Sequence, residues 1–136
     1  MIAKPLFVVA GKRKTAVAKA FVFSGKGHVT YNGQHYEALP FFHKLAISEP
    51  LKIAQETLGA LSFDIKIRTS GGGKEGQIQA ARLALAKALV RASQSLDLRK
   101  AYLKYDRALL VADTRRKEPY KPGDSKARAK RQKSYR

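Results

Sequence analysis

The sequence predicts an α+β domain in which a sheet packs against a layer of helices, followed by an extended basic C-terminal tail. Apolar and polar residues alternate from 61 to 68, which is typical of a strand with one buried face. Apolar residues recur at helical spacing from 78 to 92 and predict a helix that covers the sheet. Beyond Asp113 almost no aliphatic side chain remains for a core. We therefore expect a globular body at 1–113 and a tail at 114–136.

The composition excludes several classes of protein. The chain of 136 residues is about one domain long, and its 44% of hydrophobic residues can bury one core. Its 28 Lys and Arg exceed its 10 Asp and Glu, for a formal net charge of +18, which attracts polyanions and is atypical of a metabolic enzyme. The lack of cysteine excludes disulfides and thiolate catalysis and fits a reducing compartment. No apolar run approaches the roughly 20 residues of a membrane span, and residues 1–10 contain no signal-peptide core, so we expect a cytoplasmic protein with no membrane partner.

Three strands are expected in the body. Residues 15–23 are rich in Val and Phe and end at a glycine-containing segment. The short strand 28–31 runs into Asn32 and Gly33, the strongest short hairpin signal, so we expect an antiparallel hairpin there. The third strand is 61–67, where Leu, Phe and Ile at alternate positions form the buried face.

Helices are expected between and after these strands. Pro40 favours a helix start, and Pro50 predicts a break before a second helical stretch at 51–58 that ends at a glycine. A last helix at 96–104 completes the two layers. The principal helix has one apolar face, formed by Ile78, Ala81, Leu85, Ala88, Leu89 and Ala92.

A glycine-rich segment at 69–76 lies between the third strand and the principal helix. Glycines clear side chains away and the free N–H groups of a helix start favour anions, so one interpretation is phosphate binding by Gly71, Gly72, Gly73 and Lys74. The spacing fits neither a Walker loop nor a dinucleotide fingerprint. The interpretations that remain are a flexible strand-to-helix connection and a close approach to a nucleic-acid backbone.

Lys12, Arg13 and Lys14 precede the first predicted strand. On an alternating strand Lys12 and Lys14 face one way and Arg13 the other. One interpretation is that these cations only keep a sheet edge solvated and so prevent it from pairing with another chain. Together with the charge of the tail, they favour phosphate contacts.

No constellation of catalytic or metal-ligating residues stands out in the sequence. The three histidines lack the spacing of a metal motif, so we expect them at or near the surface, with no metal and no other cofactor. Asp106 is expected to pair with Arg107 rather than to act as a catalytic acid. Asp113 is likewise expected to pair with Arg115 or Arg116. Because no nucleophile motif is present either, we expect neither an enzyme nor a small-molecule substrate.

The tail has the most specific composition. Residues 114–136 carry ten Lys and Arg against two acids, a net charge of +8, and contain two prolines and a glycine that break any helix. Fully extended, they span on the order of 75 Å at about 3.3 Å per residue. Cations spaced by small or polar residues, with Tyr120 and Tyr135 available for base stacking, are typical of single-stranded nucleic-acid binding. A nonspecific electrostatic anchor or a localisation signal has the same composition.

Three stretches carry a resemblance to a known family: Gly-Lys-Arg-Lys-Thr-Ala at 11–16, the glycine loop with its alanine-rich helix at 71–89, and Arg-Ala-Lys-Arg-Gln-Lys-Ser-Tyr-Arg at 128–136. The chain resembles the ninth small-subunit ribosomal protein family in its archaeal and eukaryotic form. A further similar stretch at 105–113 is followed by Thr114, where the family usually has proline.

The resemblance implies a ribosomal-protein-type fold with a left-handed βαβ crossover, in a structural component of the ribosome in the cytoplasm. It implies binding to small-subunit rRNA in the head of the subunit, beside neighbouring ribosomal proteins. It also implies that the tail reaches the peptidyl site, where Arg136, helped by Lys133, contacts the anticodon stem-loop of tRNA. The residues expected to contact rRNA are Lys12, Arg13, Lys14, Gly71, Gly72, Gly73, Lys74, Arg107, Arg115, Arg116, Lys117, Lys121, Lys126, Arg128, Lys130 and Arg131.

Two other functions remain open on the residues alone. A free RNA-binding module or chaperone has the same charge and binds many single-stranded RNAs with comparable affinity. An enzyme of phosphate chemistry is the third class, because a fold does not determine a function, although no catalytic constellation supports it.

Overall fold

The computed structural model describes residues 4–131 and 133–135. Within these residues a sheet and α-helices form one body, which confirms the predicted α+β class. The elements in chain order are β1 (Phe7–Arg13), β2 (Ala16–Ser24), β3 (Val29–Tyr31), β4 (Gln34–His35), the 3₁₀ turn η1 (Tyr36–Ala38), α1 (Phe41–Leu58), β5 (Phe63–Ser70), α2 (Lys74–Ser93), α3 (Leu96–Tyr105) and the 3₁₀ turn η2 (Arg107–Leu109).

The sheet is mixed, with its strands in the order β1-β2-β5-β3-β4. β2 pairs antiparallel with both β1 and β5, whereas β5 pairs in parallel with β3. Because the parallel pair is joined through α1, the elements β3, α1 and β5 form a βαβ crossover unit. Asn32 and Gly33 connect β3 to β4 with φ values of 48° and 87°, as a two-residue turn of this kind requires. The predicted antiparallel hairpin is therefore confirmed.

The edge strand β1 has no counterpart among the predicted strands. It pairs with β2 over its whole length, from Phe7 opposite Val22 to Arg13 opposite Ala16. Its inner face lies directly on α2, since a Cβ added to Gly11 would come within 2.4 Å of the Ala80 carbonyl oxygen. The strand thus depends on the adjacent strand β2 and on α2, which is distant in sequence, so a local pattern does not reveal it.

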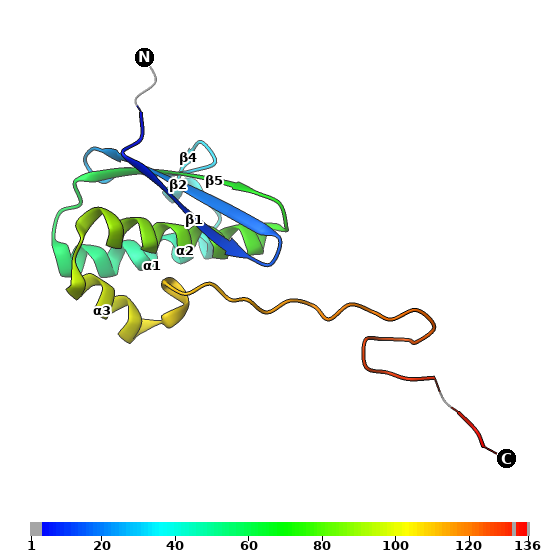
Figure 1. Ribbon diagram of the computed structural model, residues 1–136. Coiled ribbons are helices and arrows are strands. Elements are labelled where there is room, and N and C mark those ends of the chain that lie inside the picture. The colour runs from blue at the N-terminus through cyan, green and yellow to red at the C-terminus, as the bar shows by residue number, and fades with distance from the viewer. Residues whose placement is uncertain (1–3, 132, 136) are drawn as a thin grey trace.

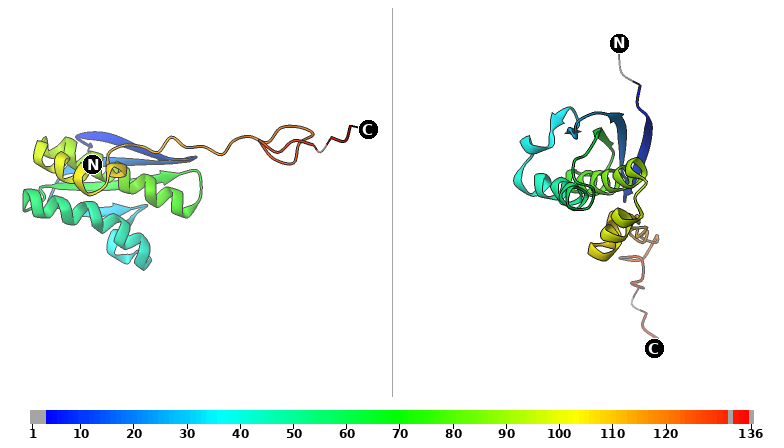
Figure 2. Two further views of the ribbon diagram at one scale, coloured as in Figure 1. Left: turned by 90° about the horizontal axis from the view of Figure 1, so that it is seen from below. Right: turned by 90° about the vertical axis from the view of Figure 1, so that its left-hand side faces the viewer.

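α1 and α2 cover one face of the sheet, and α3 packs on these helices away from the sheet (Figure 1, Figure 2). α2 is buried on more sides than its one predicted face, because the sheet lies on one side of it and α1 and α3 on the other. None of the helices in the described residues has the length and apolarity needed to cross a membrane. Prominent core residues are Ala18, Ala20, Val22, Ile47, Ile65, Ile67, Ala81, Ala84, Leu85 and Leu89.

α1 is continuous across Pro50, where the sequence predicts a break. A proline inside a helix removes one N–H donor and costs about 3 kcal/mol. Ile47, Pro50 and Ala54 are all buried on one face, at positions i, i+3 and i+7 of the helix. Burial of this continuous face offsets the cost of the proline, and the predicted break is wrong. The helix begins after Pro40 and ends before Gly59, as predicted.

After η2 the described residues form no further helix or strand, and most of them are exposed. Figure 1 shows this segment leaving the body to the right, below α1 and α2 and beside α3.

Candidate nucleic-acid interface

The turn between β1 and β2 carries three of the predicted cations. Lys12 is exposed on the outer face of β1, and Arg13 ends the strand half-buried. Lys14 lies beyond the strand with a φ of 52°, in the left-handed region. The prediction that Lys14 shares a strand face with Lys12 is therefore wrong, because the turn and not strand alternation sets its direction.

The glycine loop packs against this same turn. Gly71 has a φ of 72°, and a Cβ at this position would come within 2.7 Å of the Thr15 carbonyl oxygen. Gly72 has a φ of 63°, and its added Cβ would lie 2.9 Å from the Cβ of Ala16. Two of the glycines are therefore required for close packing of the loop on the hairpin. Gly73, in contrast, has open space around it and directly precedes α2.

Side chains hold the loop in place at both ends. Gln77 donates from Nε2 to the Gly71 carbonyl at 3.0 Å, and its Oε1 accepts from the Thr69 hydroxyl at 3.2 Å. Thr69 is also tied to the β3–β4 turn, where its N–H donates to Asn32 Oδ1 at 2.9 Å. This geometry differs from the flexible connection that one interpretation expects, and it leaves Gly73 and the start of α2 in a defined position.

A small hollow of about 250 Å³ lies between the turn and the start of α2. The N–H groups in the first turn of a helix carry partial positive charge and suit an anion. Glu75 also lines the hollow, but its exposed carboxylate pairs with His43 at 2.8 Å. The lining residues are Arg13, Lys14, Thr15, Ala16, Gly72, Gly73, Glu75, Gly76 and Gln79.

Asp113 joins the hairpin turn to the chain that leaves the body. Its carboxylate forms an ion pair with Arg13 and accepts from Arg115 Nη2 at 2.7 Å and from the Arg115 backbone N–H at 2.9 Å. Hydrogen bonds from Arg115, together with the one from Arg13, hold the pKa of Asp113 well below its usual range. The same pairing raises the pKa of Arg115. The predicted pairing of Asp113 with Arg115 is therefore present, and Arg13 is a second partner that the sequence does not reveal.

This junction forms a groove of about 830 Å³ that we call the basic groove. Five of its six lining residues are cations and none is acidic, so the groove presents concentrated positive charge. Residues about 100 positions apart in sequence meet here because β1 lies beside the segment that follows η2. The lining consists of Arg13, Lys14, Thr15, Arg115, Arg116 and Lys117.

The structure does not gather the other predicted cations into this groove. Lys74 is exposed in the first turn of α2, and Arg107 is exposed in η2. Within the tail, Arg128 pairs with Glu118 at 2.9 Å. Arg136 lies outside the described residues. The remaining predicted cations, all exposed along the tail, are Lys121, Lys126, Lys130, Arg131 and Lys133.

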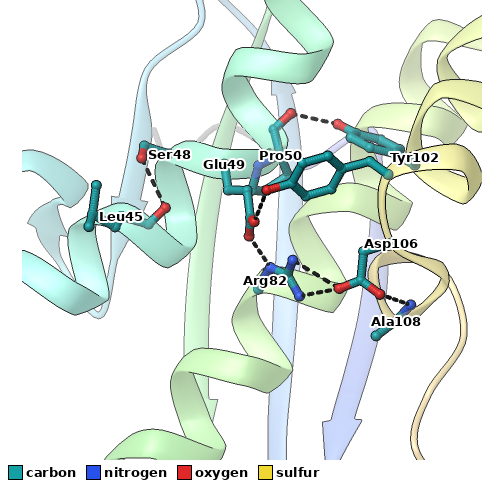
Figure 3. Close-up of polar contacts among 9 residues, drawn as sticks. Leu45, Ser48, Glu49, Pro50, Arg82, Tyr102, Asp106 and Ala108 are labelled. Atoms are coloured by element: carbon teal, nitrogen blue, oxygen red, sulfur yellow. Dashed lines mark hydrogen bonds and ion pairs between the residues drawn. The ribbon is translucent and has the colours of Figure 1, made fainter.

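A polar cluster holds the end of α3 and the start of η2 against α1 and α2 (Figure 3). Arg82 of α2 donates from Nε to Glu49 of α1 at 2.6 Å and from Nη2 to Asp106 at 3.1 Å. The predicted pairing of Asp106 with Arg107 is wrong, because the fold brings Arg82 to Asp106 from another helix. Tyr102 of α3 adds a hydrogen bond from its buried hydroxyl to the Pro50 carbonyl oxygen at 2.7 Å, and burial raises the pKa of that hydroxyl.

Sequence reasoning missed the residues that organise the site without carrying its charge. Thr69 and Gln77 hold the glycine loop, and their only sequence signal is their position on either side of the glycines. Arg82 has no such signal, because its partners come from distant segments.

Comparisons with known proteins agree over nearly the whole chain. A model of the family described as ribosomal protein S9/S16 matches residues 11–136. The small ribosomal subunit protein uS9 of Thermoplasma volcanium is 45% identical over 130 residues, which cover 95% of this chain and 97% of that protein. The proteins of the same name from Methanococcus vannielii and Methanococcus maripaludis are 43% and 44% identical over 129 residues, covering 93% of this chain and 95% of each relative.

Proposed function

Because the chain belongs to the ribosomal protein S9/S16 family, it is a structural, non-enzymatic component of the small ribosomal subunit, and we propose that its basic groove binds rRNA in the head of that subunit. As a ribosomal protein of the cytoplasm it has rRNA and other ribosomal proteins as partners. Family membership excludes the enzyme and leaves the free RNA-binding module without support. We also propose that the crossover formed by β3, α1 and β5 is left-handed, as the resemblance to the family implies.

The observation that carries the proposal is the charge and shape of the basic groove. Five cations line a single concave surface, and Asp113 holds two of them through its hydrogen bonds. Guanidinium groups held in this way lose little freedom when they bind phosphate oxygens in a bidentate manner. The small hollow beside it offers backbone N–H groups of α2 to a neighbouring phosphate.

Residues 114–136 form the second part of the proposal, as a tail that reaches the peptidyl site and contacts the anticodon stem-loop of tRNA through Lys133 and Arg136. Lys133 is exposed, and the segment carries a net charge of +8. A chain too polar to form a core becomes ordered among phosphates because released counterions offset the lost entropy.

The groove is tested with Lys14→Gln and Arg116→Gln in the full chain, with Lys52→Gln on the exposed side of α1 as the matched control. The probe is a transcript of the rRNA that forms the subunit head, bound at several salt concentrations. Each groove variant should make the slope of log affinity against log salt less steep by about 0.9, whereas the control should leave it unchanged. Slopes that match the wild type in both groove variants would contradict the proposal.

The tail is tested by deleting residues 133–136. Subunits should still assemble, because the body and the basic groove remain, but their affinity for peptidyl-site tRNA should fall. The control replaces Lys126 and Lys130 with Gln, which removes two tail charges upstream of the deleted residues. Unchanged tRNA affinity of subunits that contain the shortened chain would count against tRNA contact by the tail.

A further inference from the structure

The sheet has a second face, turned away from α1 and α2, that carries a basic surface separate from the basic groove. Residues of β1, β2 and β5 alternate between the buried core and this face, as the burial pattern of each strand shows. We call this surface the outer sheet face. It includes Val8, Ala10 and Lys12 of β1, Val17, Lys19, Phe21 and Phe23 of β2, and Asp64, Lys66 and Arg68 of β5.

The register of the sheet brings the cations of this face together. Lys19 lies directly opposite Arg68 in the β2–β5 pair and opposite Ala10 on the other side. Lys66 lies opposite Phe21, one row further along. Directly opposed residues in an antiparallel pair have their Cβ atoms about 5 Å apart, and like charges in such a pair destabilise the sheet. The free protein therefore carries a repulsion that a bound anion relieves.

One acid, Asp64, lies on the same face, two residues before Lys66 and opposite Phe23, and it offsets this charge only in part. Among the described residues, none of Lys12, Lys19, Lys66 and Arg68 forms an ion pair with a carboxylate. Asp64 is the one acidic residue of β5, and its Oδ1 accepts the backbone N–H groups that follow β2, including that of His28 at 2.9 Å.

Two phenylalanine rings support the cations. The Lys66 Nζ lies 5.1 Å from the centre of the Phe23 ring, and the Arg68 Cζ lies 5.8 Å from the centre of the Phe21 ring. Cation–π contacts of this kind restrain long side chains. Lys66 and Arg68 are thus held over two half-buried rings, which lowers the side-chain entropy that they lose on binding.

We propose that the outer sheet face is a second RNA-binding surface, at which Lys12, Lys19, Lys66 and Arg68 contact the phosphates of an RNA segment. The charge complementarity favours a polyanion over an apolar protein partner. The inference rests on the proposed function for the identity of that polyanion as rRNA, and it adds three cations, Lys19, Lys66 and Arg68, that no sequence motif indicates.

The test compares three full-length proteins with the wild type on the same transcript of the subunit-head rRNA. One carries Lys19→Gln and Arg68→Gln on the outer sheet face, one carries Lys14→Gln and Arg116→Gln in the basic groove, and one carries the control changes Lys44→Gln and Lys52→Gln on α1. The sheet-face variant should bind at least tenfold more weakly at about 0.1 M salt, with a salt slope less steep by about 1.8. Circular dichroism should show that it is folded like the wild type, so that the loss of affinity reports on binding.

The outcomes separate this inference from the proposed function. Wild-type affinity of the sheet-face variant together with weaker binding of the groove variant would overturn the inference and leave the groove proposal intact. The opposite pattern would support the outer sheet face and contradict the groove. Wild-type affinity of both the sheet-face variant and the groove variant would contradict both proposals.

Chemical labelling of lysines gives a second readout that does not depend on a variant. In the complex with this transcript, Lys19 and Lys66 should react more slowly with an amine-modifying reagent, while Lys44 and Lys52 should react as in the free protein. Protection of Lys19 and Lys66 only after other ribosomal proteins are added would overturn the inference in favour of a protein partner.

Discussion

Asp113 is the residue through which the two parts of the basic groove are connected, because Arg13 and Arg115 both bind its carboxylate. Its pKa is lowered in the folded chain, chiefly by the hydrogen bonds from Arg115. A group of this kind stabilises the folded state above its unfolded pKa of about 3.9, and this contribution is lost as the pH falls toward the folded value.

We therefore expect the melting temperature of the wild type to fall more steeply than that of Asp113→Asn when the pH is lowered from about 5 to about 2. Thermal melts followed by circular dichroism measure both curves. The pKa of Asp64 is also lowered, by backbone hydrogen bonds, of which that from His28 is the largest cause. Asp64 is present in both proteins and therefore contributes the same pH dependence to both curves. Parallel curves would show that the Asp113 contacts add no stability.

Gly72 and Gly73 are a matched pair for asking why the loop contains glycine. An added Cβ would press on Ala16 at Gly72, where φ is 63°, but would meet open space at Gly73, where φ is −106°. We expect Gly72→Ala to lower the free energy of unfolding by about 1–3 kcal/mol, the usual cost of a strained backbone position. Gly73→Ala should change it by less than about 0.5 kcal/mol. Chemical denaturation measures both values, and equal losses would refute the packing explanation for Gly72.

At the scale of the elements, α3 is anchored to α1 by the hydrogen bond from Tyr102 to the Pro50 carbonyl. The Tyr102 side chain is fully buried, so removal of its hydroxyl leaves the buried Pro50 carbonyl without this donor. Tyr102→Phe should lower the free energy of unfolding by about 1–3 kcal/mol, measured by urea denaturation. Tyr105→Phe is the control, because the Tyr105 hydroxyl binds Glu49 at an exposed site and its loss should cost less. A loss at Tyr105 as large as that at Tyr102 would contradict the role of burial.

The elements that the sequence predicts correctly are those whose pattern is local. Alternation in β5, the Asn32 and Gly33 turn, and the alanine-rich α2 all follow from spacing along the chain. The break at Pro50 is wrong because tertiary burial outweighs the intrinsic effect of proline. The same holds for the candidate site. The sequence shows which residues are cations, but it does not show that five of them lie together in the basic groove.

At the scale of the whole molecule, binding to RNA should depend steeply on salt because of the net charge of +18. Replacing the six Lys and Arg of residues 121–133 with Gln should make the salt slope on a single-stranded RNA less steep by about 4, at about 0.7 per lost contact. Filter binding from low to moderate salt measures this slope. The control replaces six cations of the helices with Gln, and it should leave the salt slope nearly unchanged if the tail is the main contact. An equal change of the slope in both variants would mean that only total charge matters.

By itself the sequence determined the charge, the class of fold, the principal helix and the family, because composition, periodicity and motifs are properties of neighbouring residues. Only the tertiary structure decided that Arg13 and Lys14 meet Arg115, Arg116 and Lys117, and that Lys19 faces Arg68 across the sheet. Strand register and the docking of distant segments follow from the burial of one shared core, and no local stretch of the chain contains that information.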